Sequence, residues 1–298
     1  MPEAPRSAGL FAFSDWDAAP ALAGVLHFAC LIWMAAIFPT TSFGVMLLLG
    51  AIYAVSISWN INGISHNFLH NPFFVDERLN RAFSLILSLT MFFSQAFYED
   101  VHTRHHIGNG DRRDAEGNTV DPLSIYGASA TDKPENVWRY TFLSFFRDDI
   151  GLTWRNLKRR YPANAQWGLI EIACVVVFVI GLLMWDWKFV IFLLPFYYLG
   201  NCLSSLNGYF EHLGSNPDVP LAWGVSSYNK LYNLIWFNNG YHAEHHYRPR
   251  HHWTKMEELR QSVASEMAEA GTHVISTSHA LGYFAKENQK LLADLGML

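Results

Sequence analysis

The sequence predicts an all-α integral membrane protein, with four transmembrane helices in two hairpins and a helical cap on one side of the bilayer. Three observations lead to this prediction. Hydrophobic residues make up 51% of the 298-residue chain and charged residues only 16%, against about 25% in ordinary soluble proteins. The apolar residues gather in long runs with few charges, and clusters of histidine stand directly outside those runs.

A helix needs about 20 apolar residues to cross a bilayer, and four runs reach or approach that length. They are residues 19–39, 43–62, 168–185 and 187–207. The first two carry no charge, the third carries only Glu171, and the fourth only Lys188. Short connections at Pro39–Ser42 and Asp186 predict two tight hairpins. A shorter run, Ala82–Tyr98, is predicted to enter or lie on the membrane without crossing it.

Four crossings place the N-terminus and the cap, residues 63–166 and 208–298, on one side of the membrane. All but one of the 21 Lys and Arg residues then fall on that side, which by the positive-inside rule is the cytoplasm. We therefore expect a single multi-pass domain, residues 1–298, whose termini are both cytoplasmic. The tail Trp253–Leu298 has helical apolar spacing and is predicted to form an amphipathic helix pair.

Charge and cysteine content exclude several classes of protein. A net charge of −5 does not suggest a nucleic-acid binder. The three cysteines, Cys30, Cys174 and Cys202, all lie in apolar runs. One chain with three thiols cannot build a four-cysteine zinc site or a cysteine-ligated iron–sulfur cluster.

The 14 histidines are the unusual feature of the composition, because most of them are clustered. An HxxxH motif follows the second apolar run, and two HxxHH motifs and a lone histidine follow later. Residues three or four apart on a helix project from one face and can share a metal. These nine residues are His66, His70, His102, His105, His106, His212, His242, His245 and His246.

Nine imidazoles exceed the four to six ligands of one metal ion and suit two. Imidazole binds iron, zinc and copper well, and it leaves the charge of the metal uncompensated. Two ferrous ions held in this way could support strongly oxidising chemistry with O2 on an unactivated C–H bond. Among the other histidines, we expect His251 and His252 to face the surface or lipid headgroups, and His273 and His279 to be solvated.

The order of these motifs between two apolar hairpins resembles the membrane fatty acid desaturase and hydroxylase superfamily, over roughly residues 56–255. The segment Gly240-Tyr241-His242-Ala243-Glu244-His245-His246 is similar to the third histidine box of the sphingolipid-desaturase branch. The superfamily pattern differs among members, and here the first box has three intervening residues and Gly208 stands four positions before the lone histidine.

The resemblance implies that the nine histidines bind two non-haem Fe²⁺ ions, with O2 as co-substrate. Because ligating imidazoles usually donate their second N–H to an acceptor, we also expect four carboxylates to act behind them. These are Glu99, Asp100, Asp111 and Glu244. The resemblance further implies a fatty acyl chain or related long-chain lipid as substrate, with desaturation as the leading reaction.

Several alternatives stay open at this point. The same superfamily includes fatty acid or alkane hydroxylases and fatty acid decarboxylases that form terminal alkenes. A membrane zinc hydrolase is a distant alternative, because His242-Ala243-Glu244-His245 only superficially resembles HExxH. The chain has no room for a cytochrome b5 domain, so we expect a separate electron donor of the ferredoxin, rubredoxin or cytochrome b5 type with its reductase.

Overall fold

The computed structural model describes residues 5–106, 110–112, 114–121, 123–129, 131, 133–147 and 149–298. The regular secondary structure of the described residues is helical apart from one short parallel strand pair, β1 (Ser226–Ser227) and β2 (Val274–Ile275). The chain divides into two compact units. The span unit comprises residues 5–101 and 149–201, and the cap unit comprises the described residues of 102–148 and 202–298.

Three helical segments of the described chain are long and apolar enough to cross a membrane. The first contains α1 (Ala18–Ile37) between the 3₁₀ turns η1 (Asp15–Asp17) and η2 (Phe38–Thr40). The second joins α2 (Phe43–Trp59) to the π-helical turn η3 (Asn60–Ser65) and α3 (His66–His70). The third is α8 (Pro162–His212).

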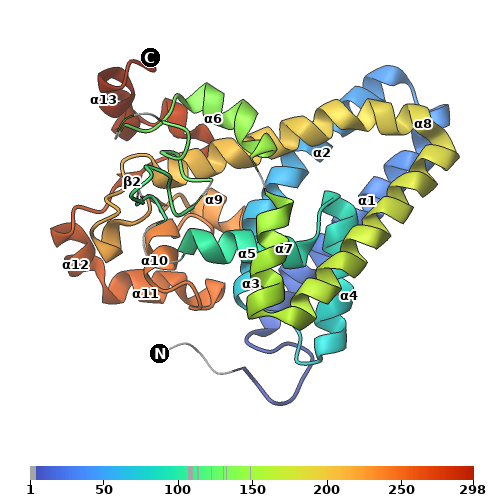
Figure 1. Cartoon of the computed structure of the whole chain (residues 1–298), viewed down its shortest axis with the longest axis horizontal. Coiled ribbons are helices and arrows are strands. Elements are labelled where there is room, and N and C mark those ends of the chain that lie inside the picture. Colours follow the sequence, from blue (N-terminus) through green and yellow to red (C-terminus); the bar gives the residue numbers. More distant parts are fainter. Residues whose placement is uncertain are drawn as a thin grey trace. The chain divides into compact units, whose positions relative to one another are not determined.

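Helix α8 contains both of the later predicted spans. Its 51 residues would extend about 76 Å as a straight helix, more than twice the roughly 30 Å hydrocarbon core. The backbone of Asp186 is not helical, with φ −157° and ψ 98°, and Figure 1 shows two arms diverging from a bend in α8. The predicted turn at Asp186 is therefore confirmed, whereas the crossing of the bilayer by each arm stays a prediction.

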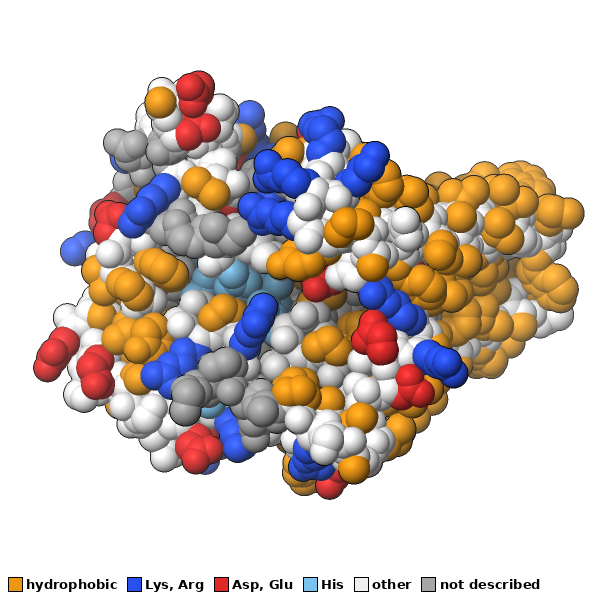
Figure 2. All heavy atoms as spheres, turned by 60° about the horizontal axis from the view of Figure 1, so that its bottom comes forward, with side chains coloured by type: hydrophobic (Ala, Val, Ile, Leu, Met, Phe, Trp, Pro, Cys, Tyr) orange, Lys and Arg blue, Asp and Glu red, His pale blue; other side chains and the backbone are white. Residues whose placement is uncertain are grey.

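The surface of the span unit is apolar around this bend. Met184, Trp185 and Trp187 are among its most exposed large side chains, and Figure 2 shows hydrophobic side chains covering this end of the unit. Water would not favour a patch of this kind on a soluble protein. A hydrocarbon environment accounts for it.

The shorter apolar run Ala82–Tyr98 is divided between two helices, α4 (Glu77–Met91) and α5 (Gln95–His106). Phe92 ends α4 in the left-handed region, with φ 56°. Neither helix is among those that could cross a membrane. This agrees with the prediction that the run does not cross, although the run is not one helix.

The start of α5 is held by a buried carboxylate from α8. Glu171 is fully buried and accepts hydrogen bonds from the Ser84 and Ser94 hydroxyls and from the Ala96 backbone N–H. Ser94 also caps the helix by accepting the N–H of Phe97. Negative charge at a helix N-terminus is favourable, so this one charge of the predicted third span anchors the helix that carries the second histidine cluster.

Small residues bring α2 and α8 into close contact within the span unit. A Cβ atom added at Gly200 would lie 2.6 Å from the Ile57 Cβ and 2.7 Å from the Ala54 carbonyl oxygen. At Gly50 it would lie 2.6 Å from the Phe196 ring. Close backbone approach at small residues is a common way for helices to associate in membranes.

We expect Gly200→Ala to destabilise the protein by about 1–3 kcal/mol, the usual cost of overpacking, because backbone atoms of α2 cannot yield as a flexible side chain can. Thermal unfolding in detergent, followed by tryptophan fluorescence, would show a lower midpoint. Gly181→Ala is the matched control on the same helix, since nothing lies within 4 Å of its Cβ position. Equal midpoints for the two variants would contradict the close contact.

The remaining elements are short. The span unit also contains α7 (Ile150–Arg160). The helical elements of the cap unit are α6 (Val137–Leu143), η4 (Ser144–Phe146), η5 (Pro220–Ala222), α9 (Lys230–Ile235), α10 (His242–Tyr247), η6 (Trp253–Lys255), α11 (Met256–Ser262), α12 (Ala264–Glu269), η7 (His279–Phe284) and α13 (Lys286–Asp294).

The tail differs from the predicted helix pair, because it is broken into five helical pieces and the strand β2. The apolar spacing that led to the prediction is nevertheless real. Met256, Leu259, Val263 and Met267 are all buried in one cluster against Tyr241 and Ala243. The non-helical backbone of Val263, with φ −121°, separates α11 from α12.

Two expectations for the outlying histidines are wrong. His279 is fully buried, with Nδ1 3.0 Å from the Tyr232 hydroxyl and Nε2 2.9 Å from the Val225 carbonyl oxygen. His252 is only 1% exposed. Both are packing residues of the cap unit, because polar partners within the fold replace water.

Candidate metal centre

The first histidine pair lies in the span unit, directly after a distortion of its helix. The π-helical turn η3 places His66 and His70 on α3, with ring centroids 5.1 Å apart. Single π-turns inserted in α-helices are frequent at functional sites. The Ser65 hydroxyl donates to the Asn60 side chain across this turn, at 2.9 Å.

Seven further histidines belong to the cap unit. His102, His105 and His106 lie on α5, and His212 is the last residue of α8. The third cluster forms most of α10, where His242, His245 and His246 are all buried. Within the cap unit, these seven residues form two groups.

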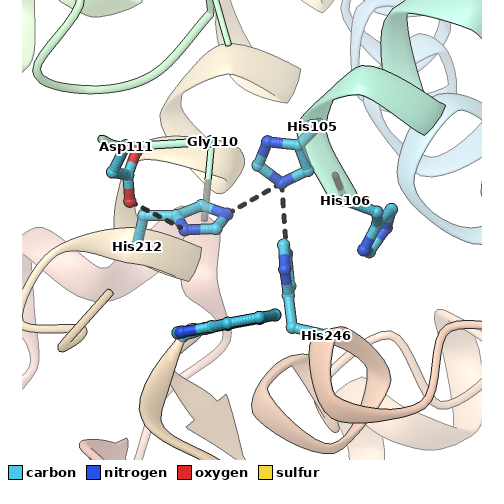
Figure 3. A pocket seen from close by; sticks show the side chains of 7 residues that line it. His105, His106, Gly110, Asp111, His212 and His246 are labelled. Atoms are coloured by element: carbon cyan, nitrogen blue, oxygen red, sulfur yellow. Dashed lines mark hydrogen bonds and ion pairs between the residues drawn. The ribbon is translucent and has the colours of Figure 1, made fainter. Parts of the chain in front are cut away.

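The first group contains His105, His212, His242 and His246, whose ligand atoms all lie within 4.8 Å of one another. The Nε2 atom of His105 lies 3.0 Å from that of His212 and 3.1 Å from that of His246. The Nε2 atoms of His212 and His242 are 3.1 Å apart. Figure 3 shows three of these rings turning their nitrogens toward a common point.

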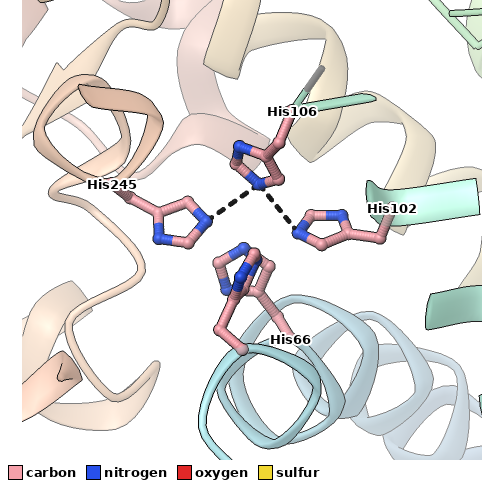
Figure 4. Close-up of side chains that lie close together, drawn as sticks. His66, His102, His106 and His245 are labelled. Carbon is pink, nitrogen blue, oxygen red and sulfur yellow. Dashed lines mark hydrogen bonds between the residues drawn. The ribbon is translucent and has the colours of Figure 1, made fainter. Parts of the chain in front are cut away.

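The second group contains His102, His106 and His245, again with ligand nitrogens within 4.8 Å of one another. The Nε2 atom of His106 lies 3.0 Å from those of His102 and His245. Figure 4 shows these three rings converging from α5 and α10. Neighbours in the sequence thus fall in different groups. His105 belongs to the first group and His106 to the second, whereas His245 belongs to the second group and His246 to the first.

Carboxylates stand behind the first group. Asp121 Oδ2 lies 2.7 Å from Nδ1 of His105 and is itself almost fully buried. Burial lowers the pKa of His105, but the hydrogen bond to Asp121 and its charge outweigh this effect, so that the pKa is raised above its usual value. Asp111 Oδ2 lies 4.0 Å from Nδ1 of His212, and Glu211 Oε1 lies 3.8 Å from Nδ1 of His242.

This arrangement fits a metal cation. A proton on Nδ1 of His105, facing Asp121, leaves its Nε2 lone pair pointing at two other Nε2 atoms. Lone pairs at this distance repel each other unless a proton or a cation lies between them. Ligand nitrogens about 2.1 Å from a metal and at right angles to each other lie about 3 Å apart, which matches the observed separations. The donor set of neutral imidazoles suits iron, zinc or copper.

A small pocket opens beside this first group. It is lined by His105, His106, Gly110, Asp111, His212, Trp223 and His246. An added Cβ at Gly110 would lie 2.9 Å from the Asp121 Cβ and 3.1 Å from the His105 carbonyl oxygen. The absence of a side chain at Gly110 therefore allows the loop to pack closely against both residues.

The predicted carboxylates are placed differently from one another. Asp111 faces His212. Glu244 is fully buried and accepts from the hydroxyls of Ser226, at 2.6 Å, and Tyr228, at 2.7 Å. Glu99 accepts from Asn164 within the span unit, at 3.3 Å, and Asp100 is buried there. The contacts established for the Glu99 and Glu244 carboxylates are thus with amide and hydroxyl groups.

Two carboxylates outside the four predicted ones also face histidines. Asp121 follows His105 by 16 residues, a separation that carries no helical signal. Glu211 adjoins the lone histidine but faces His242 instead, and it accepts from Asn239 at 2.7 Å and Asn207 at 2.8 Å. Glu211 is the only acidic residue between Lys188 and Asp218, and this isolated carboxylate was the available signal.

Comparison with known proteins gives two matches. The family model described as fatty acid desaturase matches residues 39–278. The rice (Oryza sativa subsp. japonica) protein named sphingolipid delta(4)-desaturase DES1-like is 25% identical to this chain over 239 residues, which cover 77% of this chain and 68% of the rice protein. No solved structure shows a significant match.

Proposed function

Because the chain belongs to the fatty acid desaturase family, we propose that it is an O2-dependent, non-haem di-iron oxidoreductase that desaturates a fatty acyl chain or a related long-chain lipid. The observation that carries the proposal is the convergence of seven cap-unit histidines into two groups. One metal site would need only one of these groups. A zinc hydrolase would keep about three protein ligands and would not account for the second group.

The residues that would hold the two ions follow from the groups. His105, His212, His242 and His246 would bind one ion, and His102, His106 and His245 would bind the other. Three imidazoles leave the second ion short of ligands, so we propose that His66 and His70 complete it, as the order of the family's motifs suggests. Bound iron would supply the activation of O2 and the oxidation of the C–H bond.

The protein's own residues would orient these ligands. Asp121 would keep the Nδ1 proton on His105 and so direct its Nε2 lone pair toward the ion. Asp111 and Glu211 face the Nδ1 atoms of His212 and His242 from farther away. Burial raises the pKa of Asp111 above its usual value.

The reaction defines the partners that the protein would need. Forming one double bond removes two hydrogens from the chain, and reducing O2 to two waters consumes these together with two electrons and two protons. A separate donor of the ferredoxin, rubredoxin or cytochrome b5 type, with its reductase, would deliver the electrons. Arg112, Arg248 and Arg250 are basic candidates for docking it; Arg113, also considered from the sequence, lies outside the described residues.

Expression in a host that lacks the protein, followed by mass spectrometry of lipids and hydrocarbons, tests this function. We expect new lipids that have lost two hydrogens at one position, and none from the His245→Ala variant. Fatty acyl and sphingolipid pools are both measured, because the rice relative is named for a sphingolipid. Hydroxylated lipids or terminal alkenes in place of desaturated ones would contradict desaturation, and an unchanged profile would contradict the proposal.

We propose that both termini and the metal site face the cytoplasm, because all but one of the 21 basic residues fall on that side of four crossings. Reporter fusions at either end would report a cytoplasmic location, with a fusion inserted beside Asp186 as the control for the opposite side. A terminal reporter that is exported would contradict four crossings or their orientation.

A further inference from the structure

The cap unit has a helix whose outward face is apolar. Trp138, Phe142 and Phe146 follow one another four residues apart along α6 and η4, and they are 43%, 45% and 69% exposed. Leu143, on the same outward side, is 47% exposed. A helix at the surface of a soluble protein shows the opposite pattern, with its polar residues outward.

This face is held firmly by the residues beneath it. The Asn136 side chain caps α6 by accepting the N–H groups of Trp138 and Arg139, at 3.0 and 3.2 Å. The hydroxyl of Tyr140, on the inward side, donates to the Leu123 carbonyl oxygen at 2.7 Å. Arg147 closes the segment with two hydrogen bonds to the Glu135 carboxylate, at 2.6 and 2.8 Å. The outward position of the aromatic rings is therefore built into the fold.

The same segment is tied to the end of an apolar helix. The Ser144 hydroxyl donates to that of Ser205 at 2.8 Å, and Ser205 lies in the last turn of the apolar stretch that runs along α8 from Trp187. If the second arm of α8 crosses the bilayer, residues beside Ser205 lie at the level where the helix leaves the hydrocarbon. The segment α6–η4 would then lie beside the point where this helix leaves the hydrocarbon.

The residue types on the outward face of α6 and η4 suit the membrane–water interface. Tryptophan is enriched at membrane–water interfaces, and the exposed Arg139 can keep its charged end in water while its stem covers apolar surface. The patch extends to the tail, because the Trp138 ring lies 5.3 Å from that of Tyr283, whose ring in turn lies 5.5 Å from the Phe284 ring. Phe284 is 74% exposed.

We propose that the outward face of α6 and η4 is a membrane-contact surface, seated in the boundary between headgroups and acyl chains. Its occupant is phospholipid, because the face joins the end of an apolar helix and combines aromatic rings with a basic residue. The surface would attach the cap unit to the bilayer in addition to the helices that cross it. The proposal requires the α8 crossing but does not depend on the reaction that the protein catalyses.

Photo-crosslinking in lipid nanodiscs tests the surface. The full-length variants Phe142→benzoylphenylalanine and Phe146→benzoylphenylalanine are reconstituted with phosphatidylcholine and phosphatidylglycerol and irradiated, and the adducts are identified by mass spectrometry. Both side chains are exposed, so their replacement leaves the core intact. Lys133→benzoylphenylalanine is the matched control, because it is exposed and lies just before α6.

We expect phospholipid adducts at positions 142 and 146 and none above background at position 133. Adducts with a second copy of the chain or with another protein at positions 142 and 146 would overturn the proposal, since the face would then be a protein interface. The absence of lipid adducts at both positions would overturn it as well. Desaturase activity is not measured, so failure of the proposed function cannot produce either result.

Discussion

Replacing His212 with alanine is expected to remove at least half of the bound iron and to reduce lipid oxidation to background. The Nε2 atom of His212 lies 3.0 Å from that of His105 and 3.1 Å from that of His242. Its loss would leave three imidazoles, from two helices, to hold an ion that prefers four to six ligands. Metal analysis of anaerobically purified protein, together with lipid profiling, measures both effects.

His251→Ala is the matched control for His212→Ala, since it removes an imidazole five residues beyond the third cluster. His251 bonds to the Lys255 carbonyl oxygen at 3.2 Å and belongs to neither histidine group. This variant should retain iron and activity. Loss of iron in His251→Ala with retention in His212→Ala would show that the ligand lies after the third cluster and that the present assignment is wrong.

The second large effect is expected from Asp121→Asn. An amide at this position can still hydrogen-bond to the His105 ring, but it carries no negative charge and can present its NH2 group instead of an acceptor. The preferred tautomer of His105 would be lost, and residues that orient metal ligands typically affect metal affinity or activity about 10–100-fold. Iron retention during dialysis against a chelator of graded concentration measures the loss of affinity.

Asp114→Asn is the control for this change, because Asp114 lies in the same loop and is exposed. Its carboxylate accepts only the backbone N–H groups of Glu116 and Asn118 among its established contacts, and an asparagine oxygen can replace it there. Iron affinity should be unchanged in this variant. Equal iron loss in the two variants would assign the effect to the loop rather than to the contact between Asp121 and His105.

Local sequence properties determined the apolar helices. The predicted run 19–39 agrees with α1 at Ala18–Ile37, and the run 43–62 agrees with α2 and the first residues of η3. Hydropathy predicts such segments well, because a helix in hydrocarbon must satisfy its backbone hydrogen bonds within itself and needs no distant partner to form. Hydropathy also predicted the turn at Asp186, because this charged residue interrupts two apolar runs.

Histidine spacing determined which rings could share a helix face, but only the tertiary structure decided how they are grouped. His105 and His106 are adjacent and lie in different groups because neighbouring residues point about 100° apart on a helix. The partners of each ring come from other elements, as Asp121 does for His105 across 16 residues. Burial of His279 likewise depends on Tyr232 and Val225. Such contacts join residues far apart in the chain, and hydropathy and helical period describe only residues that are close together in it.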